Sequence, residues 1–186
     1  PNQIRQIMNQ VKPELIINAG AYTAVDKAES EPELAKAINS IAPKILAEEA
    51  MNQSALLIHY STDYTYSGEM AKRPYLESDT PSPQSVYGVT KLEGDRAIKQ
   101  SGASHLIFKT GWVYSKNGSS FLSKISQLAK ERDELRIVND QIGTPTWCKS
   151  ISDTTGQIIK QLIEKKEGSL AKISSSISGM YHMTCR

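Results

Sequence analysis

Apolar positions along this chain follow two spacings, which alternate several times between its ends. Where single apolar residues recur every three or four positions, as at Ile4, Met8 and Val11, the spacing predicts an amphipathic helix. Short unbroken runs, such as Leu15-Ile16-Ile17, predict strands that are buried on both faces. The predicted helices cover residues 2–12, 30–50, 84–100, 119–131 and 150–165. The predicted strands cover residues 15–17, 55–60, 105–114, 135–139 and 180–183.

Local sequence signals set several boundaries of these elements. Pro13 ends the first helix, and Ser30 with Glu33 three residues later matches a capping box that opens the second. The segment Ser67–Pro83 is rich in Pro, Ser, Gly and Asp, which favours a loop. Because helices separate the strands, their order predicts βαβ units. The expected fold class is α/β, a Rossmann-like, doubly wound parallel sheet with helices on both faces.

Side chains suited to chemistry gather directly after the predicted strands. In an open parallel sheet, ligands bind beyond the carboxyl ends of the strands. Most of the polar and aromatic candidates in this chain fall in such positions, which favours an enzyme. The segments concerned are residues 18–26, 61–66, 110–114 and 140–145.

Composition and charge exclude several other classes of protein. The formal net charge is +2, and the basic residues are scattered, which argues against a nucleic-acid surface. No stretch approaches 18 consecutive apolar residues, so no membrane span is expected. Cys148 and Cys185 have no metal-ligand spacing with the three histidines, and the carboxylates are scattered. We therefore expect reduced thiols, no metal site and a cytoplasmic protein.

Tyr87 and Lys91 form a Tyr-x-x-x-Lys pair near the start of a predicted helix. Residues four apart share one helical face, and an ammonium near a phenol lowers its pKa. The phenol then becomes a usable proton donor near neutral pH. The pair alone is a weak signal, because a packed tyrosine and a solvated lysine give the same spacing.

Three other segments at strand ends strengthen this interpretation. Ser61-Thr62-Asp63 closes an apolar run, and a hydroxyl there can bond a substrate carbonyl beside the phenol or simply cap the strand. The small residues of Asn18–Ala21 let a flat cofactor approach the backbone, or form an ordinary turn. Trp112 can stack on a base or sugar, although a lone tryptophan more often belongs to a core.

Six blocks, in order, resemble the dTDP-4-dehydrorhamnose reductase family, a group of extended short-chain dehydrogenases/reductases. The resemblance runs from about residue 3 to residue 183, and its ordered blocks make it far more specific than any single motif. The blocks are NAGAYTAVDKAESEPELA, HYSTDYTYSG, PYLESD, VYGVTKLEGD, TGWVYSKNGSSF and ERDELRIVNDQIGTPTW.

The resemblance implies a role for each matching residue. The implied catalytic residues are Thr62, Tyr87 and Lys91. The implied cofactor-binding residues are Ala21, Tyr22, Thr23, Tyr60, Tyr87 and Lys91. The implied substrate-binding residues are Val25, Asp26, Thr62, Asp63 and Trp112.

The resemblance also implies a reaction, the reduction of dTDP-4-dehydro-L-rhamnose to dTDP-L-rhamnose. NADPH is the expected hydride donor, with NADH left open, and Tyr87 is the expected proton donor to the oxygen on C4. Thr62 is expected to hydrogen-bond that oxygen, while Lys91 lowers the phenol pKa and holds the nicotinamide ribose. The expected partner is a dTDP-4-keto sugar, with a homodimer as a candidate assembly.

The sequence departs from the family pattern at three strand-end positions. Lys109 stands where the family has arginine, Gly111 where it has serine, and Gly20 where it has alanine. These changes leave the exact sugar open.

The family's first βαβ unit and the C-terminal part of its substrate-binding region have no counterpart here, and no Gly-x-x-Gly-x-x-Gly occurs. We expect residues 1–140 to form a partial dinucleotide-binding Rossmann domain. Residues 141–186 are expected to begin the substrate-binding region, interleaved with the last strand. By itself the chain is expected not to bind NADPH appreciably, and the strand at residues 15–17 is expected at a sheet edge.

Two alternatives stay open. An epimerase or dehydratase of the same superfamily shares these motifs, but the dehydratases resemble Thr-Asp-Glu where Tyr64 follows Asp63 here. A non-catalytic subunit similar to the regulatory subunit of methionine adenosyltransferase belongs to a different functional class.

Overall fold

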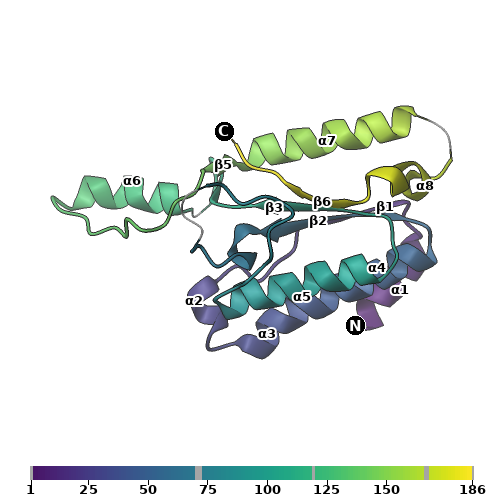
Figure 1. Ribbon diagram of the computed structural model, residues 1–186, viewed down its shortest axis with the longest axis horizontal. Coiled ribbons are helices and arrows are strands. Elements are labelled where there is room, and N and C mark those ends of the chain that lie inside the picture. The colour runs from purple at the N-terminus through teal and green to yellow at the C-terminus, as the bar shows by residue number, and fades with distance from the viewer. Residues whose placement is uncertain (1, 70–72, 119, 166–167, 186) are drawn as a thin grey trace.

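The computed structural model describes residues 2–69, 73–118, 120–165 and 168–185 of the 186-residue chain, and its elements form three layers (Figure 1). The central sheet is made of β1 (Leu15–Asn18), β2 (Leu56–Thr62), β3 (His105–Thr110) and β6 (Gly179–His182). One face is covered by α1 (Asn2–Val11), α4 (Ala42–Asn52) and α5 (Val86–Gln100). The other is covered by α7 (Cys148–Glu164) and α8 (Leu170–Ser174). The predicted doubly wound α/β fold is confirmed.

The four strands lie in the order β1-β2-β3-β6, and every pairing is parallel. Leu15 pairs with Leu56 at one end of the β1–β2 ladder, while Thr62 pairs with Thr110 where β2 and β3 end together. β1 lies at an edge of this described sheet, as expected. The shared carboxyl end of β2 and β3 places residues 61–66 and 110–114 next to each other.

Successive residues of β2 and β3 supply two separate apolar clusters, because neighbouring side chains point to opposite faces of a sheet. Leu57 and Ile107 pack with Met8, Ala47 and Ile98 beneath α1, α4 and α5. The alternate positions face α7 and pack with its Leu162; they are Leu56, Ile58, Leu106 and Phe108. This two-sided burial explains why the strands are unbroken apolar runs.

The predicted capping box at Ser30 and Glu33 was wrong. The Ser30 hydroxyl donates back to the Lys27 carbonyl at 2.9 Å, so it closes the short helix α2 (Val25–Ala28) instead of opening the next. The next helix, α3, begins at Pro32 after an N-cap residue, Glu31, whose side chain makes no capping bond. Proline suits the first turn because its missing N–H would have no partner there.

A π-helical turn, Ala37–Ile41, joins α3 (Pro32–Lys36) to α4 without a break. Pro43 follows this turn and has no N–H to donate to the Asn39 carbonyl four residues earlier. Widening the helix here relieves the clash that the proline ring would make with that carbonyl. The turn directs the Asn39 carbonyl toward Gly94 of α5.

Two strand predictions were also wrong in part. Residues 105–114 do not form one strand, because the chain turns at Trp112, which has a positive φ of 49°. The separate strand β4 (Val113–Tyr114) then pairs with β5 (Thr146–Trp147). Residues 135–139 form no strand; Ile137 and Val138 are 48% and 66% exposed, so this apolar run lacks a buried face.

The remaining helix, α6 (Phe121–Glu131), extends away from the layered body (Figure 1). It begins with a capping box between Ser120 and Ser123, and none of its residues is buried. Within the described ranges, the helices are all too short or too polar to span a membrane.

Gly94 should be essential for the packing of α5. A Cβ at this position would lie 2.2 Å from the Asn39 carbonyl oxygen, a backbone atom that cannot easily move. We expect Gly94→Ala to lower the free energy of unfolding by about 1–3 kcal/mol, as overpacked cores do. The matched control is Gly156→Ala on α7, where a Cβ meets nothing within 4 Å. The control should raise stability by about 0.5–1 kcal/mol. Urea denaturation measures the free energy of unfolding of both variants. Equal changes in Gly94→Ala and Gly156→Ala would show that the close approach at Gly94 does not matter for stability.

Candidate active site

Thr62 and Tyr87 meet at the carboxyl end of β2. The Thr62 hydroxyl oxygen accepts the Tyr64 N–H at 3.2 Å, which starts the 3₁₀ turn Asp63–Thr65. Tyr87 lies in the first turn of α5, and its phenol is close enough to the Thr62 side chain for Thr62 to lower its pKa. The structure therefore brings together two of the three predicted catalytic residues.

The sequence around Tyr87 explains how α5 comes so close to this turn. Ser85 caps the helix by accepting the Gly88 N–H at 3.1 Å. A Cβ at Gly88 would lie 2.3 Å from the Tyr64 carbonyl oxygen, so only glycine permits the approach. From the other side, the Glu29 carboxylate accepts the Val86 N–H at 2.8 Å.

The phenol of Tyr87 lies in an apolar pocket. Ala28 and Ala35 form one cluster with it, and two residues predicted to bind ligands, Tyr22 and Val25, pack against that cluster. The Tyr64 ring lies edge-on at 5.5 Å between centroids. Burial raises the pKa of Tyr87, and the neighbouring Thr62 side chain opposes that rise only in part.

The expectation that Lys91 lowers the pKa of Tyr87 is not met in this structure. The Lys91 side chain is 1% exposed, and its Nζ donates to the Tyr60 carbonyl at 2.7 Å. The same nitrogen lies 3.3 Å from His59 Nε2. Burial lowers the pKa of Lys91 to about 8, although the Asp95 carboxylate opposes this. The amino group of Lys91 is thus directed toward the end of β2, while the phenol experiences mainly its apolar surroundings.

Asp63 lies beside Thr62 and close to Gly111, which follows the carboxyl end of β3. It accepts a hydrogen bond from the Thr62 hydroxyl at 3.2 Å, and burial raises the pKa of its carboxyl. A Cβ at Gly111 would lie 2.1 Å from Asp63 Oδ2. Glycine at 111 therefore makes room for the Asp63 carboxylate in its present position.

The other candidates lie around this centre in different ways. The Tyr22 hydroxyl donates to Glu31 at 2.6 Å, and its main chain exchanges two hydrogen bonds with the Asn39 side chain. Ala21 is half-buried, and Thr23 is exposed. Asp26 is also exposed; burial raises the pKa of Tyr64, and the charges of Asp63 and Asp26 add to that rise. The loop thus places Tyr22 against the Tyr87 cluster and leaves Thr23 and Asp26 facing solvent.

Tyr60 and Trp112 point to other parts of the site. The Tyr60 side chain faces α7, where its hydroxyl and the Thr155 hydroxyl lie 2.8 Å apart, so its ring is on the opposite sheet face from Lys91. Trp112 packs edge-on against Phe121 of α6 at 5.6 Å and lies against Gly143. Its backbone carbonyl accepts the Thr146 N–H at 3.1 Å.

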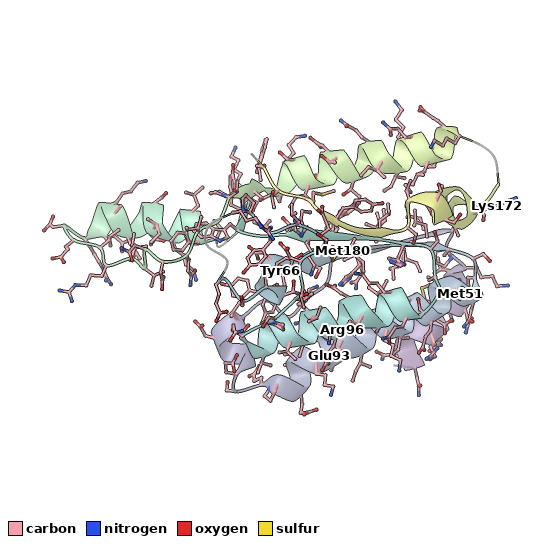
Figure 2. The ribbon with its side chains drawn as sticks, viewed as in Figure 1. Met51, Tyr66, Glu93, Arg96, Lys172 and Met180 are labelled. Carbon is pink, nitrogen blue, oxygen red and sulfur yellow. The ribbon has the colours of Figure 1, made fainter. Side chains whose placement is uncertain are left out.

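The sequence reasoning missed a buried polar cluster between α5 and the sheet. Asp95 Oδ2 accepts hydrogen bonds from Ser61 at 2.7 Å and from Lys109 at 2.9 Å. Lys109 also donates to Thr65 at 2.7 Å. Asp95 is 2% exposed, whereas the adjacent Arg96 on α5 is exposed (Figure 2). The spacing of Lys91 and Asp95, four residues apart on one helical face, was the available signal.

The described part of the chain brings no three His, Cys, Asp or Glu side chains into an arrangement that could hold a metal ion.

A parallel sheet between two helical layers, with a Tyr-x-x-x-Lys helix beside a strand-end threonine, defines a Rossmann-like protein of the extended short-chain dehydrogenase/reductase class. The model of the RmlD substrate binding domain family matches residues 1–186, and the chain belongs to this family.

Individual relatives agree with this assignment. A dTDP-4-dehydrorhamnose reductase of Escherichia coli K12 is 41% identical over 98% of the chain. A solved dTDP-4-dehydrorhamnose reductase of Clostridium acetobutylicum matches with a TM-score of 0.85 at 37% identity over 98% of the chain. One from Bacillus anthracis, solved in complex with NADP, matches with a TM-score of 0.83 at 33% identity over the whole chain. The chain spans 58% of the E. coli relative and 60% of each of these two structures.

Breaking the Asp95–Lys109 pair should destabilise the fold strongly. Lys109→Met leaves a buried carboxylate without its cation, and such losses cost about 3–5 kcal/mol of unfolding free energy. Lys149→Met is the matched control, because Lys149 pairs with Asp153 at an exposed site on α7. Exposed pairs contribute about 0–1 kcal/mol. Urea denaturation curves of both variants decide the matter, and a Lys109→Met variant as stable as the control would contradict this account.

Proposed function

We propose that the protein containing this chain reduces the 4-keto group of dTDP-4-dehydro-L-rhamnose to give dTDP-L-rhamnose, with NADPH as hydride donor. The observation that carries this proposal is the placement of the Tyr87 phenol beside the Thr62 hydroxyl at the carboxyl end of β2. The names of the relatives, and the NADP complex of one of them, support it.

The residues at this edge suit a nicotinamide cofactor. Ala19 and Gly20 leave the backbone exposed after β1. Thr110, which pairs in register with Thr62, has a buried hydroxyl with no hydrogen-bond partner among the described residues. Ala21, Tyr22 and Thr23, with Tyr60, would form the cofactor wall of the site. Tyr87 would lie beside the nicotinamide, and Lys91 would hold its ribose. When bound, the cofactor supplies the hydride.

Tyr87 is the proposed proton donor to the carbonyl oxygen. Burial raises the pKa of its phenol, so the group remains protonated at neutral pH and carries the proton that reduction consumes. Thr62 lies beside the phenol. Its single hydroxyl proton, which Asp63 accepts in this structure, would turn to the same substrate oxygen when the substrate binds.

The substrate side of the site is assigned to residues beyond the ends of β1, β2 and β3. Asp63 would accept hydrogen bonds from sugar hydroxyls, and Trp112 would provide a stacking surface. Val25 and Asp26 would line the opposite wall. Residues 141–186 are proposed to begin the substrate-binding region, with residues 1–140 as part of the dinucleotide-binding domain.

The alternative functions predict different products. A reductase consumes NADPH and yields dTDP-L-rhamnose, whereas an epimerase leaves the cofactor pool unchanged and a dehydratase releases water. A regulatory subunit similar to that of methionine adenosyltransferase turns over none of these sugars. Incubating the complete protein with NADPH and dTDP-4-dehydro-L-rhamnose, and identifying the product by mass spectrometry and NMR, separates them.

In the complete protein, Tyr87→Phe should lower kcat by about 10²–10⁴-fold, because only the proton donor is removed. Affinity for NADPH, measured by nicotinamide fluorescence, should change little. Tyr181→Phe is the control; its hydroxyl bonds the Ile177 carbonyl at 2.6 Å, well away from the site. Near-normal turnover of Tyr87→Phe would rule out the assigned proton donor.

Gly111→Ser restores the residue that the family pattern carries, yet it should impair this protein. A Cβ there would push the Asp63 carboxylate from its position, since the two would be 2.1 Å apart. Losing a hydrogen bond to a charged group costs about 1.5–3 kcal/mol, so the KM for the sugar nucleotide should rise by about 10–100-fold. Gly179→Ser is the control, because a Cβ there meets only ordinary contacts from 3.6 Å outward. An unchanged KM for Gly111→Ser would exclude Asp63 from the substrate contacts.

A further inference from the structure

A line of hydrogen-bonding contacts links the loop after β1 to the buried Lys91. The Gly20 N–H donates to Asn18 Oδ1 at 3.2 Å. Asn18 Nδ2 lies 2.9 Å from His59 Nδ1, and His59 Nε2 lies 3.3 Å from Lys91 Nζ. Lys91 in turn donates to the Tyr60 carbonyl at 2.7 Å. These contacts run through the interior, since His59 and Lys91 are at most 1% exposed.

The direction of each contact follows from the chemistry of its groups. Asn18 accepts from Gly20 with its oxygen, so its amide NH₂ is the group that faces His59. An NH₂ group can only donate, and His59 Nδ1 must therefore be an unprotonated acceptor. The imidazole proton then lies on Nε2. Burial and the charges of Lys91 and Lys109 lower the pKa of His59 well below its ordinary value, which agrees with a neutral ring.

This tautomer has a consequence for Lys91. His59 Nε2 lies 3.3 Å from Lys91 Nζ, within hydrogen-bond distance, and 3.8 Å from Asp95 Oδ1, beyond it. A neutral amine offers a lone pair to the N–H on Nε2, whereas an ammonium offers only more protons. Charging Lys91 in the same place would require the imidazole proton to move to Nδ1. The Asn18 amide would then have to turn its oxygen toward His59, and the Gly20 N–H would lose its acceptor.

We propose that His59 and Asn18 are positioning residues that couple the protonation of Lys91 to the loop Asn18–Ala21. Only the catalytic meaning of this coupling rests on the proposed function. Other charged groups face Lys91 as well: the Asp95 carboxylate on α5 raises its pKa, and the Lys109 ammonium on β3 lowers it. His59 on β2 is the one neighbour of Lys91 described here whose own proton position depends on a residue of that loop.

The test is an NMR titration that needs no substrate. In the chain with ¹³C-labelled lysine, the Lys91 Cε signal, assigned by its loss in Lys91→Met, gives the pKa of Lys91. In the unmutated chain the Gly20 amide proton should titrate with the same midpoint, because it loses its acceptor as Lys91 charges. A Gly20 amide that does not follow Lys91 overturns the proposal without any variant.

Three variants locate the coupling. His59→Asn retains an amide near the Nδ1 position and loses the contact with Lys91, while His59→Gln retains an amide near Nε2 that can offer an oxygen to an ammonium. Each should raise the pKa of Lys91 by about one unit or more, because the neutral amine loses its donor. Asn18→Ala should raise it too and uncouple the Gly20 amide. His105→Asn, at the amino end of β3, is the control and should leave both titrations unchanged.

An unchanged Lys91 pKa in His59→Asn and Asn18→Ala overturns the proposal, and so does an equal shift in His105→Asn. If His59→Asn or Asn18→Ala does not fold, as judged by circular dichroism, the remaining one of the two and the titration of the unmutated chain still test the proposal. The outcome is separate from that of the proposed function: a protein without reductase activity can still show the coupled titration. A reductase in which Gly20 does not follow Lys91 retains its function and loses only this coupling.

Discussion

The carboxylate of Asp95 on α5 connects this helix to the two strands whose ends carry the candidate site. It accepts hydrogen bonds from Ser61 on β2 and from Lys109 on β3, and Lys109 reaches on to Thr65 in the turn that follows β2. The helix bearing Asp95 also carries Lys91 one turn earlier. A buried ion pair of this kind adds little net stability compared with an apolar core, but its geometry admits few alternatives. It therefore fixes where the helix lies along the two strands.

Most of the layered fold could be predicted from the sequence, because burial on both sheet faces leaves a strong local pattern. The runs at residues 15–17 and 55–60, and the helix from residue 84 to residue 100, lie where that pattern put them within a few residues. The pattern failed where an apolar run has no buried surface to cover, as at Ile137 and Val138. It also failed at Ser30, since the same motif can end one helix or begin another.

The residues of the candidate site could be predicted from the sequence better than the electrostatic interactions among them. Thr62 and Tyr87 were expected together and lie side by side, but Lys91 points to the Tyr60 carbonyl and His59 rather than to the phenol. Spacing on a helix tells which residues share a face, not which atoms they reach across the interface. The charges that surround Lys91 come from other elements, and only the folded chain shows them together.

The π-helical turn at Ala37–Ile41 has an effect on the phase of the whole helical rod. One additional residue in a regular α-helix would rotate everything that follows by about 100° around the axis, and the wider π-helical turn absorbs that rotation. Ala35, before the turn, faces the Tyr87 cluster, while Ala47, after it, faces the core beneath the sheet. The two alanines therefore point in nearly the same direction on one continuous rod, whereas a regular α-helix with the same sequence would turn them about 120° apart. Deleting one residue there would convert the wide turn into an ordinary α-helical turn and leave both alanines facing the interior.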